Sequence, residues 1–153
     1  MKSVLRLSFV LLIATALFSC KKTVYVTPSP VNPLEGTWAL TSAEESGAYG
    51  WHGFSTGLES GTFNFYGNGA ATYSDGYYYM QGSWTMYAVN SGYYDEYNNY
   101  HTGTHNAIVF HLSDNTKGST VDLYFDYVQF YNGEFVATFD NGVSTERYWF
   151  GRY

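Results

Sequence analysis

The four histidines are the residues whose spacing most directly suggests chemistry. His101 and His105 stand four residues apart in the segment HTGTH, and Asp95 and Glu96 lie just upstream. On a helix this spacing would place both imidazoles on one face, as zinc sites require. Gly103, between two threonines, argues against a helix, and no second ligand pair has recognisable spacing. The sequence therefore predicts neither a metal site nor a cofactor.

Carboxylate pairs are the second group that could support a reaction. Hydrolysis of a glycosidic bond needs two carboxylates about 5–10 Å apart in a cleft. The candidates all lie in two long predicted loops, where solvated carboxylates are far more common than catalytic pairs: Glu44, Glu45, Glu59, Asp95 and Glu96. The chain has no Gly-x-Ser-x-Gly motif, no cysteine–histidine pair and no phosphate-binding glycine loop. We therefore expect a protein that is not an enzyme.

Aromatic residues in the same two loops give the remaining functional signal. The first loop contains Tyr49, Trp51 and Phe54, and the second contains Tyr93, Tyr94, Tyr97 and Tyr100. Exposed aromatic rings mark binding surfaces, because a flat amphipathic ring supplies contact area at little entropic cost. If the loops are neighbours, these residues form a ligand-binding cluster at one mouth of a barrel. The alternative is that the rings fill the barrel and complete its core.

Composition excludes two broad classes of protein. Of the 153 residues 21% are aromatic, which supplies enough apolar area to exclude intrinsic disorder. From residue 34 onward the only basic residues are Lys117, Arg147 and Arg152, against all 13 carboxylates. Nucleic-acid binding needs clustered cations and is excluded. The length fits one domain, which we expect to be a monomer.

The N-terminal residues predict an export signal and a lipid anchor. Lys2 and Arg6 precede an apolar run over residues 7–18, too short for a membrane-spanning helix. The sequence Leu17-Phe18-Ser19-Cys20 resembles the lipobox of bacterial lipoproteins, so residues 1–19 are the predicted signal peptide and Cys20 the residue that receives acyl chains such as palmitate. The alternative is an ordinary secretory signal that leaves a free cysteine.

Residues 20–33 are predicted to form the lipidated cysteine and an extended tether, because residues 23–33 contain three prolines and no helical period. Lys21 and Lys22 follow the anchor, where they either contact anionic headgroups or are simply solvated. Surface-displayed lipoproteins of this kind usually carry acidic residues there. The resemblance therefore implies a protein on the periplasmic side of the bacterial outer membrane.

Residues 34–153 alternate between apolar and polar side chains with a period of two, which predicts an all-β domain. Eight strands are expected, over residues 36–42, 61–66, 70–74, 77–88, 106–112, 120–131, 134–140 and 143–152, with loops over 43–60 and 89–105. A change of parity predicts a bend near residues 126–128. Hairpin turns between sequence neighbours favour an up-and-down antiparallel barrel, since closure removes unpaired edges. A two-sheet sandwich is the alternative.

The two ends of this domain resemble a known family. The opening segment LEGTWALTS, with its Gly36-x-Trp38, and the closing YWFGR, with Arg152, are similar to the first and last strands of lipocalin-like domains in Bacteroidetes-type lipoproteins. The resemblance implies that Arg152 packs across the Trp38 indole and closes the barrel floor. On this basis Arg152→Ala is predicted to destabilise the domain more than Arg147→Ala.

The sequence is consistent with two functions. The first is non-catalytic binding of a small apolar or amphipathic molecule inside a lipocalin-like barrel, with the domain attached to the membrane through its lipid anchor. The second is a carbohydrate- or protein-binding module that uses the Tyr-rich loops on a solid barrel. Interior volume discriminates between them, because an eight-strand barrel is just wide enough to be filled by side chains or to hold one small ligand.

Overall fold

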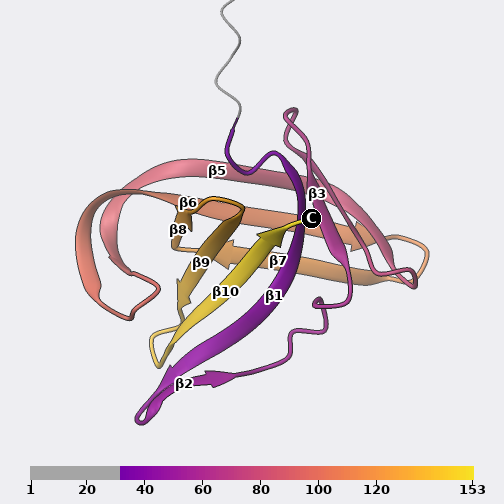
Figure 1. The fold of residues 1–153 in the computed structure, drawn as a ribbon. Coiled ribbons are helices and arrows are strands. Elements are labelled where there is room, and N and C mark those ends of the chain that lie inside the picture. The colour runs from indigo at the N-terminus through magenta and orange to yellow at the C-terminus, as the bar shows by residue number, and fades with distance from the viewer. Residues whose placement is uncertain (1–31) are drawn as a thin grey trace, which may run out of the picture. The chain divides into compact units, whose positions relative to one another are not determined.

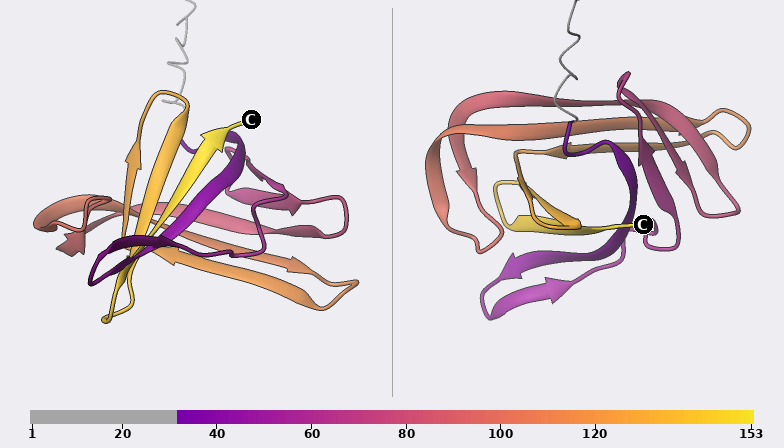
Figure 2. Two further views of the ribbon diagram at one scale, coloured as in Figure 1. Left: turned by 60° about the horizontal axis from the view of Figure 1, so that its bottom comes forward. Right: turned by 45° about the horizontal axis from the view of Figure 1, so that its top comes forward.

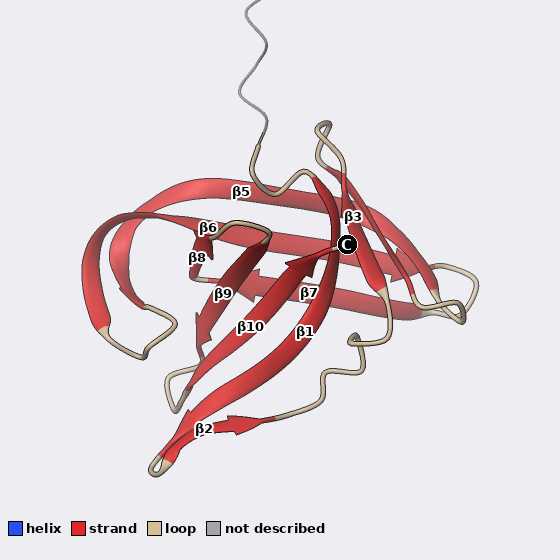
Figure 3. Cartoon of the chain, viewed as in Figure 1, coloured by secondary structure: helices blue, strands red, loops and turns tan. Residues whose placement is uncertain are grey.

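A computed structural model describes residues 32–153, which form a domain of strands and loops (Figures 1 and 3). The chain divides into two units, Met1–Pro30 and Val31–Tyr153, and only the second is described. The predicted signal peptide, Cys20 and most of the tether therefore lie outside the described residues. Within residues 32–153, no helix has the length and apolar character needed to cross a bilayer.

Ten strands make up the domain. They are β1 (Gly36–Gly47), β2 (Gly50–Gly53), β3 (Thr62–Phe65), β4 (Ala70–Ser74), β5 (Tyr79–Tyr94), β6 (Tyr100–Asp114), β7 (Ser119–Phe125), β8 (Tyr127–Phe130), β9 (Glu134–Asp140) and β10 (Thr145–Arg152). They form one antiparallel sheet in the order β7-β6-β5-β4-β3-β1-β10-β9-β8, and β2 pairs with β1 outside this path. The all-β prediction is confirmed. The hydrogen-bonded path is not closed into a barrel, because its end strands β7 and β8 do not pair with each other.

Side chains on the inner face of the sheet form one apolar core. The buried residues of this core include Trp38, Leu40, Phe63, Phe65, Met80, Trp84, Ile108, Phe110, Leu112, Phe125, Phe135, Ala137, Tyr148 and Phe150. Partly buried side chains pack against them: Tyr78, Met86, Val121, Leu123 and Phe139. The buried rings contact each other directly. Phe135 stacks on Phe150 with ring centroids 4.4 Å apart, and Phe65 lies 4.7 Å from Phe110.

The bend predicted near residues 126–128 is confirmed at Asp126, which separates β7 from β8. β7 pairs with β6, whereas β8 pairs with β9. Asp126 stabilises this switch from β6 to β9 by two hydrogen bonds to β9. Its amide donates to the Thr138 carbonyl at 2.8 Å, and its carboxylate accepts from the Asp140 amide at 2.8 Å. The two ends of the open sheet are thus joined in the chain by a single residue.

The predicted loop over residues 89–105 is wrong. β5 and β6 pair without interruption from Gln81↔Ser113 to Tyr94↔Tyr100, so only a short turn connects them. The distal half of this hairpin is a two-stranded ribbon built mainly from Tyr, Asn, Gly, Thr and His, and most of its residues are exposed. It therefore has no apolar alternation to reveal it. Near the other end of the hairpin, Gly82 lets the two strands approach closely because it has no side chain. A Cβ at this position would collide with the His111 carbonyl oxygen.

The predicted loop over residues 43–60 is partly wrong. β1 continues to Gly47 and forms a short hairpin with β2, so that His52 lies in a strand instead of a loop. The remaining loop, residues 54–61, packs Leu58 against the core. Alternation fails to predict β2 because three of its four residues are exposed.

The distal half of the β5–β6 hairpin curls back toward β9 and β10 (Figure 1 and the right-hand view of Figure 2). The Thr138 hydroxyl on β9 donates to the Tyr94 carbonyl at 2.6 Å, and the Thr145 hydroxyl on β10 donates to the Asn98 side-chain oxygen at 2.6 Å. Thr138 follows the inward-facing Ala137 in the strand, so its side chain points to the outer face. It is nevertheless only 1% exposed. The hairpin tip therefore covers the outer face of the sheet at Thr138 of β9 and at the start of β10.

Candidate binding site

The tip of the β5–β6 hairpin is shaped by Asp95. Its carboxylate accepts from the amides of Tyr97 at 2.9 Å and Asn99 at 2.8 Å, and it contacts His101 Nε2 at 2.8 Å. Burial alone would raise the pKa of Asp95, but the hydrogen bonds from Asn99 and His101 outweigh it and lower that pKa. The turn also places Asn98 at a φ of 66°, a left-handed conformation that asparagine tolerates better than most residues.

Arg147 joins the hairpin tip to β1 and β2. Its guanidinium carbon lies 3.8 Å from the ring centroid of Trp51, its Nε donates to the Glu44 carboxylate at 2.7 Å, and its Nη1 donates to the Glu96 carbonyl at 2.6 Å. We call these four residues the Arg147 junction. The two segments that carry the predicted aromatic cluster are therefore neighbours, but they meet on the outer face of β10, beside an arginine.

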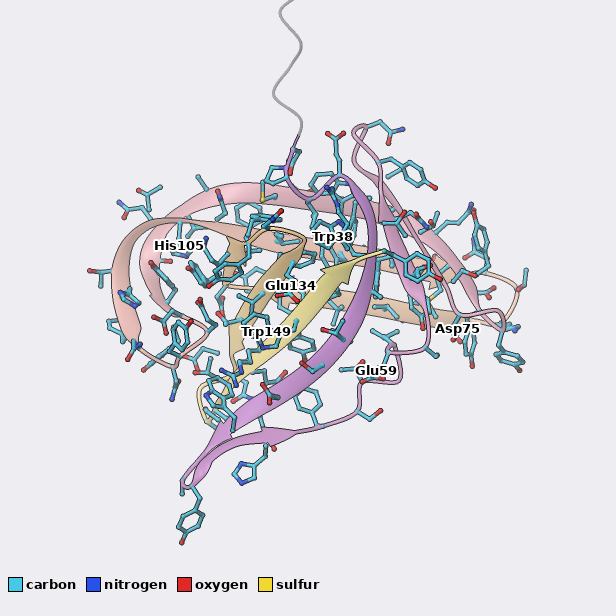
Figure 4. All side chains as sticks on the ribbon, in the orientation of Figure 1. Trp38, Glu59, Asp75, His105, Glu134 and Trp149 are labelled. Carbon is cyan, nitrogen blue, oxygen red and sulfur yellow. The ribbon has the colours of Figure 1, made fainter. Side chains whose placement is uncertain are left out.

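Tyr131 and Trp149 extend this surface toward the other end of β10. Their rings are nearly parallel, with an interplanar angle of 22° and centroids 6.4 Å apart. Trp149 lies on the front of β10 in Figure 4. The Tyr131 hydroxyl donates to the buried carboxylate of Glu96. Burial, followed by this hydrogen bond, raises the pKa of Tyr131, so its phenol stays a donor over the physiological range.

A polar cavity of about 230 Å³ opens beside the Arg147 junction, and we call it the outer cleft. It is lined by Ser46, Tyr94, Asn98, Asp140, Gly142, Val143, Ser144 and Thr145. Three turns build it: the hairpin tip, the end of β1 and the β9–β10 turn. Asn98 uses its side-chain oxygen to accept from Thr145. The Asn98 amide group and the Asp140 carboxylate thus supply a donor and an acceptor within one cavity.

The other predicted aromatic residues have separate positions. Tyr93 stacks on Tyr127 with ring centroids 4.6 Å apart, inside the curl of the hairpin. Its ring is tilted by 38° to that of His105, 4.1 Å away (Figure 4 labels His105). Burial, with the charge of Glu96 next in importance, raises the pKa of Tyr127 to about 12. Phe54 packs edge-on against the core residue Tyr148 at 5.7 Å.

Tyr49, Tyr97 and Tyr100 are the exposed members of the predicted set. Tyr49 is 97% exposed in the turn between β1 and β2, and Tyr97 and Tyr100 are exposed around the hairpin tip. Tyr94, which lines the outer cleft, lies 5.2 Å from Tyr100 between ring centroids. Of the predicted ligand-binding residues, the structure therefore places Tyr94 in the outer cleft and Trp51 in the adjoining junction.

Trp38 and Arg152 lie at the other end of β1 and β10. The Arg152 guanidinium carbon is 4.9 Å from the Trp38 ring centroid, and its Nη2 donates to the Glu35 carbonyl at 2.6 Å. The indole nitrogen of the buried Trp38 donates to the Leu34 carbonyl at 2.8 Å. Arg152 therefore lies over the Trp38 indole, while closure of a barrel floor by this pair stays a prediction.

Three of the four histidines have structural partners. His101 contacts Asp95 at the hairpin tip, His105 contacts the Gly103 carbonyl at 3.0 Å, and His111 contacts Asp122 at 2.8 Å. Among residues 32–153, no three histidine, cysteine or acidic side chains are grouped in a way that could hold a metal ion.

The residues of the outer cleft that sequence reasoning missed are Asn98, Asp140 and Thr145. Asn98 lies in a turn, Asp140 ends β9 and Thr145 begins β10. Asn, Asp and Thr are common in and beside turns for conformational reasons, so no local signal distinguishes them. No protein-family model, curated protein or solved structure matches the chain.

Proposed function

We propose that the protein is a non-catalytic binding module that recognises a neutral carbohydrate in the outer cleft, with the β-domain as a solid scaffold. One observation carries this proposal: donors and acceptors from three turns converge on a polar cavity with Tyr94 in its wall. Sugar hydroxyls both donate and accept, and an aromatic ring can stack on the apolar face of a pyranose. Trp149 and Tyr131 offer further stacking surface nearby.

Packing of the interior supports the surface function over an interior one. Aromatic rings occupy the positions on the inner face and contact each other at centroid distances of 4.4–6.5 Å. The other expected function, an apolar molecule inside the barrel, would need that volume to be free. The outer cleft is instead open to solvent and polar, in keeping with a hydrated ligand.

The proposed scaffold is an eight-strand, lipocalin-like barrel. This assignment treats β7 and β8 as one strand bent at Asp126, and β2 as an addition to β1. Seven of the eight strands then have a hydrogen-bonded neighbour on both sides. The bent strand pairs with β6 through its first half and with β9 through its second.

We further propose that the module is attached to the periplasmic side of the outer membrane through acylated Cys20, on the strength of Leu17-Phe18-Ser19-Cys20. A labelled fatty-acid analogue fed to cells should be incorporated into the wild-type chain and not into Cys20→Ser. Equal labelling of both chains would contradict the anchor without bearing on the outer cleft.

Calorimetric titration with neutral cello-, manno- and malto-oligosaccharides tests the carbohydrate proposal. Asn98→Gly keeps the left-handed backbone but removes the amide, and Tyr94→Ala removes the ring. Each should weaken binding by about tenfold or more, because the first leaves a sugar hydroxyl without its partner and the second removes the stacking surface. Tyr79→Ala is the matched control, since Tyr79 is 56% exposed at the start of β5. Binding of no oligosaccharide, or equal binding by all variants, would refute the proposal.

A further inference from the structure

A second cavity lies where the sheet is open, between β7 and the β9–β10 pair. It measures about 240 Å³ and is lined by Asp122, Leu123, Tyr124, Phe125, Phe139, Glu146 and Tyr148; we call it the side pocket. It exists because β7 follows β6 up to Asp126 and does not pair with β9. The outer cleft uses none of these residues.

The base and walls of the side pocket are aromatic. Phe125 and Tyr148 are buried and meet edge to face, with ring centroids 4.9 Å apart. Tyr124 and Phe139 meet in the same way at 6.2 Å, and Leu123 adds an aliphatic wall. Two charged groups accompany these apolar walls, and both are carboxylates: Glu146 and Asp122.

The two carboxylates differ in their partners. Asp122 contacts His111 at 2.8 Å. Glu146 accepts from the Tyr148 hydroxyl at 2.6 Å and from the Asn141 side-chain amide at 3.2 Å, and it takes part in none of the ion pairs found among residues 32–153. Like Tyr148, two residues on in the same strand, it points to the inner side of the sheet. Glu146 is thus an anion whose hydrogen-bond partners are neutral donors, and aromatic rings lie beside it. A site of this kind is complementary to a cation.

We propose that the side pocket binds a small organic ammonium ion with an aromatic or aliphatic body. The ammonium group would donate a charge-assisted hydrogen bond to Glu146 and lie near the aromatic rings of Phe139 and Tyr148, and the body would contact Leu123 and Phe125. The volume lies below the range of about 300–1,000 Å³ typical of drug-sized ligands. This limits the ligand to a compact amine. Anions are excluded, because both carboxylates would repel them.

Three probes of nearly equal shape test the proposed preference for an ammonium group: 2-phenylethylamine, 2-phenylethanol and 3-phenylpropionate. Calorimetric titration of the full chain at neutral pH should give tighter binding of the amine than of the alcohol by about tenfold, and no binding of the carboxylate. Glu146→Gln keeps the side chain's shape and should reduce the amine's affinity to that of the alcohol. Glu134→Gln, which removes the same charge from the exposed start of β9, should leave the preference intact.

A steric variant keeps the test decisive if Glu146→Gln fails to fold. Leu123→Phe adds bulk inside the side pocket and should abolish binding of all neutral and cationic probes, while oligosaccharide binding at the outer cleft persists. Failure of the amine to bind, equal affinity for amine and alcohol, or an amine preference retained in Glu146→Gln would each overturn the proposal. None of these outcomes alters the carbohydrate result, because the two cavities share no lining residue.

Discussion

At the scale of single residues, Arg147 and Arg152 have very different surroundings. Arg147 is half-buried and holds the Glu44 carboxylate, the Glu96 carbonyl and the Trp51 ring at once, whereas Arg152 is exposed and holds the Trp38 ring and the Glu35 carbonyl. Loss of a partly buried ionic hydrogen bond costs more than loss of an exposed cation–π contact.

We therefore expect Arg147→Ala to lower the free energy of unfolding by about 2 kcal/mol, and Arg152→Ala by about 0.5–1 kcal/mol. This reverses the order predicted from the sequence. Urea denaturation of the two variants decides between them, and a larger effect for Arg152→Ala would restore the earlier prediction.

Tyr127 should make the domain sensitive to alkaline pH. Its pKa is raised from 10.0 to about 12 by burial and by the neighbouring charge of Glu96. The unfolded chain then releases this proton near pH 10 while the folded chain retains it, so the free energy of unfolding falls as pH rises between 10 and 12. Tyr127→Phe should flatten this part of the profile in urea melts, whereas Tyr153→Phe, at a position 85% exposed, should not. Parallel profiles for all three chains would exclude this role of Tyr127.

At the scale of elements, the distal β5–β6 hairpin is held by its turn and by its contacts with β9 and β10. Asp95→Ala removes the acceptor for the amides of Tyr97 and Asn99, and should destabilise the hairpin locally by about 1–2 kcal/mol. Hydrogen exchange should become faster at residues 87–107, while the core strands keep their protection.

Asp75→Ala provides the matched control for that variant. Asp75 accepts from the amides of Tyr77 at 2.8 Å and Tyr78 at 2.7 Å in the β4–β5 turn, a similar local arrangement. This variant should loosen its own turn and leave the distal hairpin unchanged. Faster exchange throughout the domain in Asp95→Ala would mean that the hairpin and the core unfold as one unit.

At the scale of the whole molecule, stability depends on the filled interior. Ala137 is fully buried among the core rings, so Ala137→Phe should overpack the core and cost about 1–3 kcal/mol. Ala88→Phe, at an exposed position of β5, should change stability by less than about 0.5 kcal/mol. If Ala137→Phe were tolerated equally well in urea melts, the interior would contain free volume and binding inside the barrel would again be the better hypothesis.

The sequence by itself determined the all-β fold class, most of the core and the positions of the hairpin turns. Alternation of apolar residues fixes which side chains face inward, and this signal is local because neighbouring residues of a strand point to opposite faces. Gly69, Gly76, Gly133 and Gly142 each follow an Asn or Asp and have φ between 82° and 86°. The preceding Asn or Asp does not have positive φ, so these are not the type I′ turns that the Asx-Gly pairs suggest, which need positive φ at both residues. The bend at Asp126 was predicted from the same alternation, because the apolar residues change there from one set of alternate positions to the other.

Only the tertiary structure decided where the distal β5–β6 hairpin ends and what its tip contacts. The paired ribbon has few apolar side chains, so no periodicity marks it. It is held by hydrogen bonds from Thr138 and Thr145, about 45 residues farther along the chain. Arg147 likewise connects segments about 50 and 100 residues away. Both proposed binding sites depend on such long-range contacts, which cannot be read from local sequence because their partners are brought together only by folding.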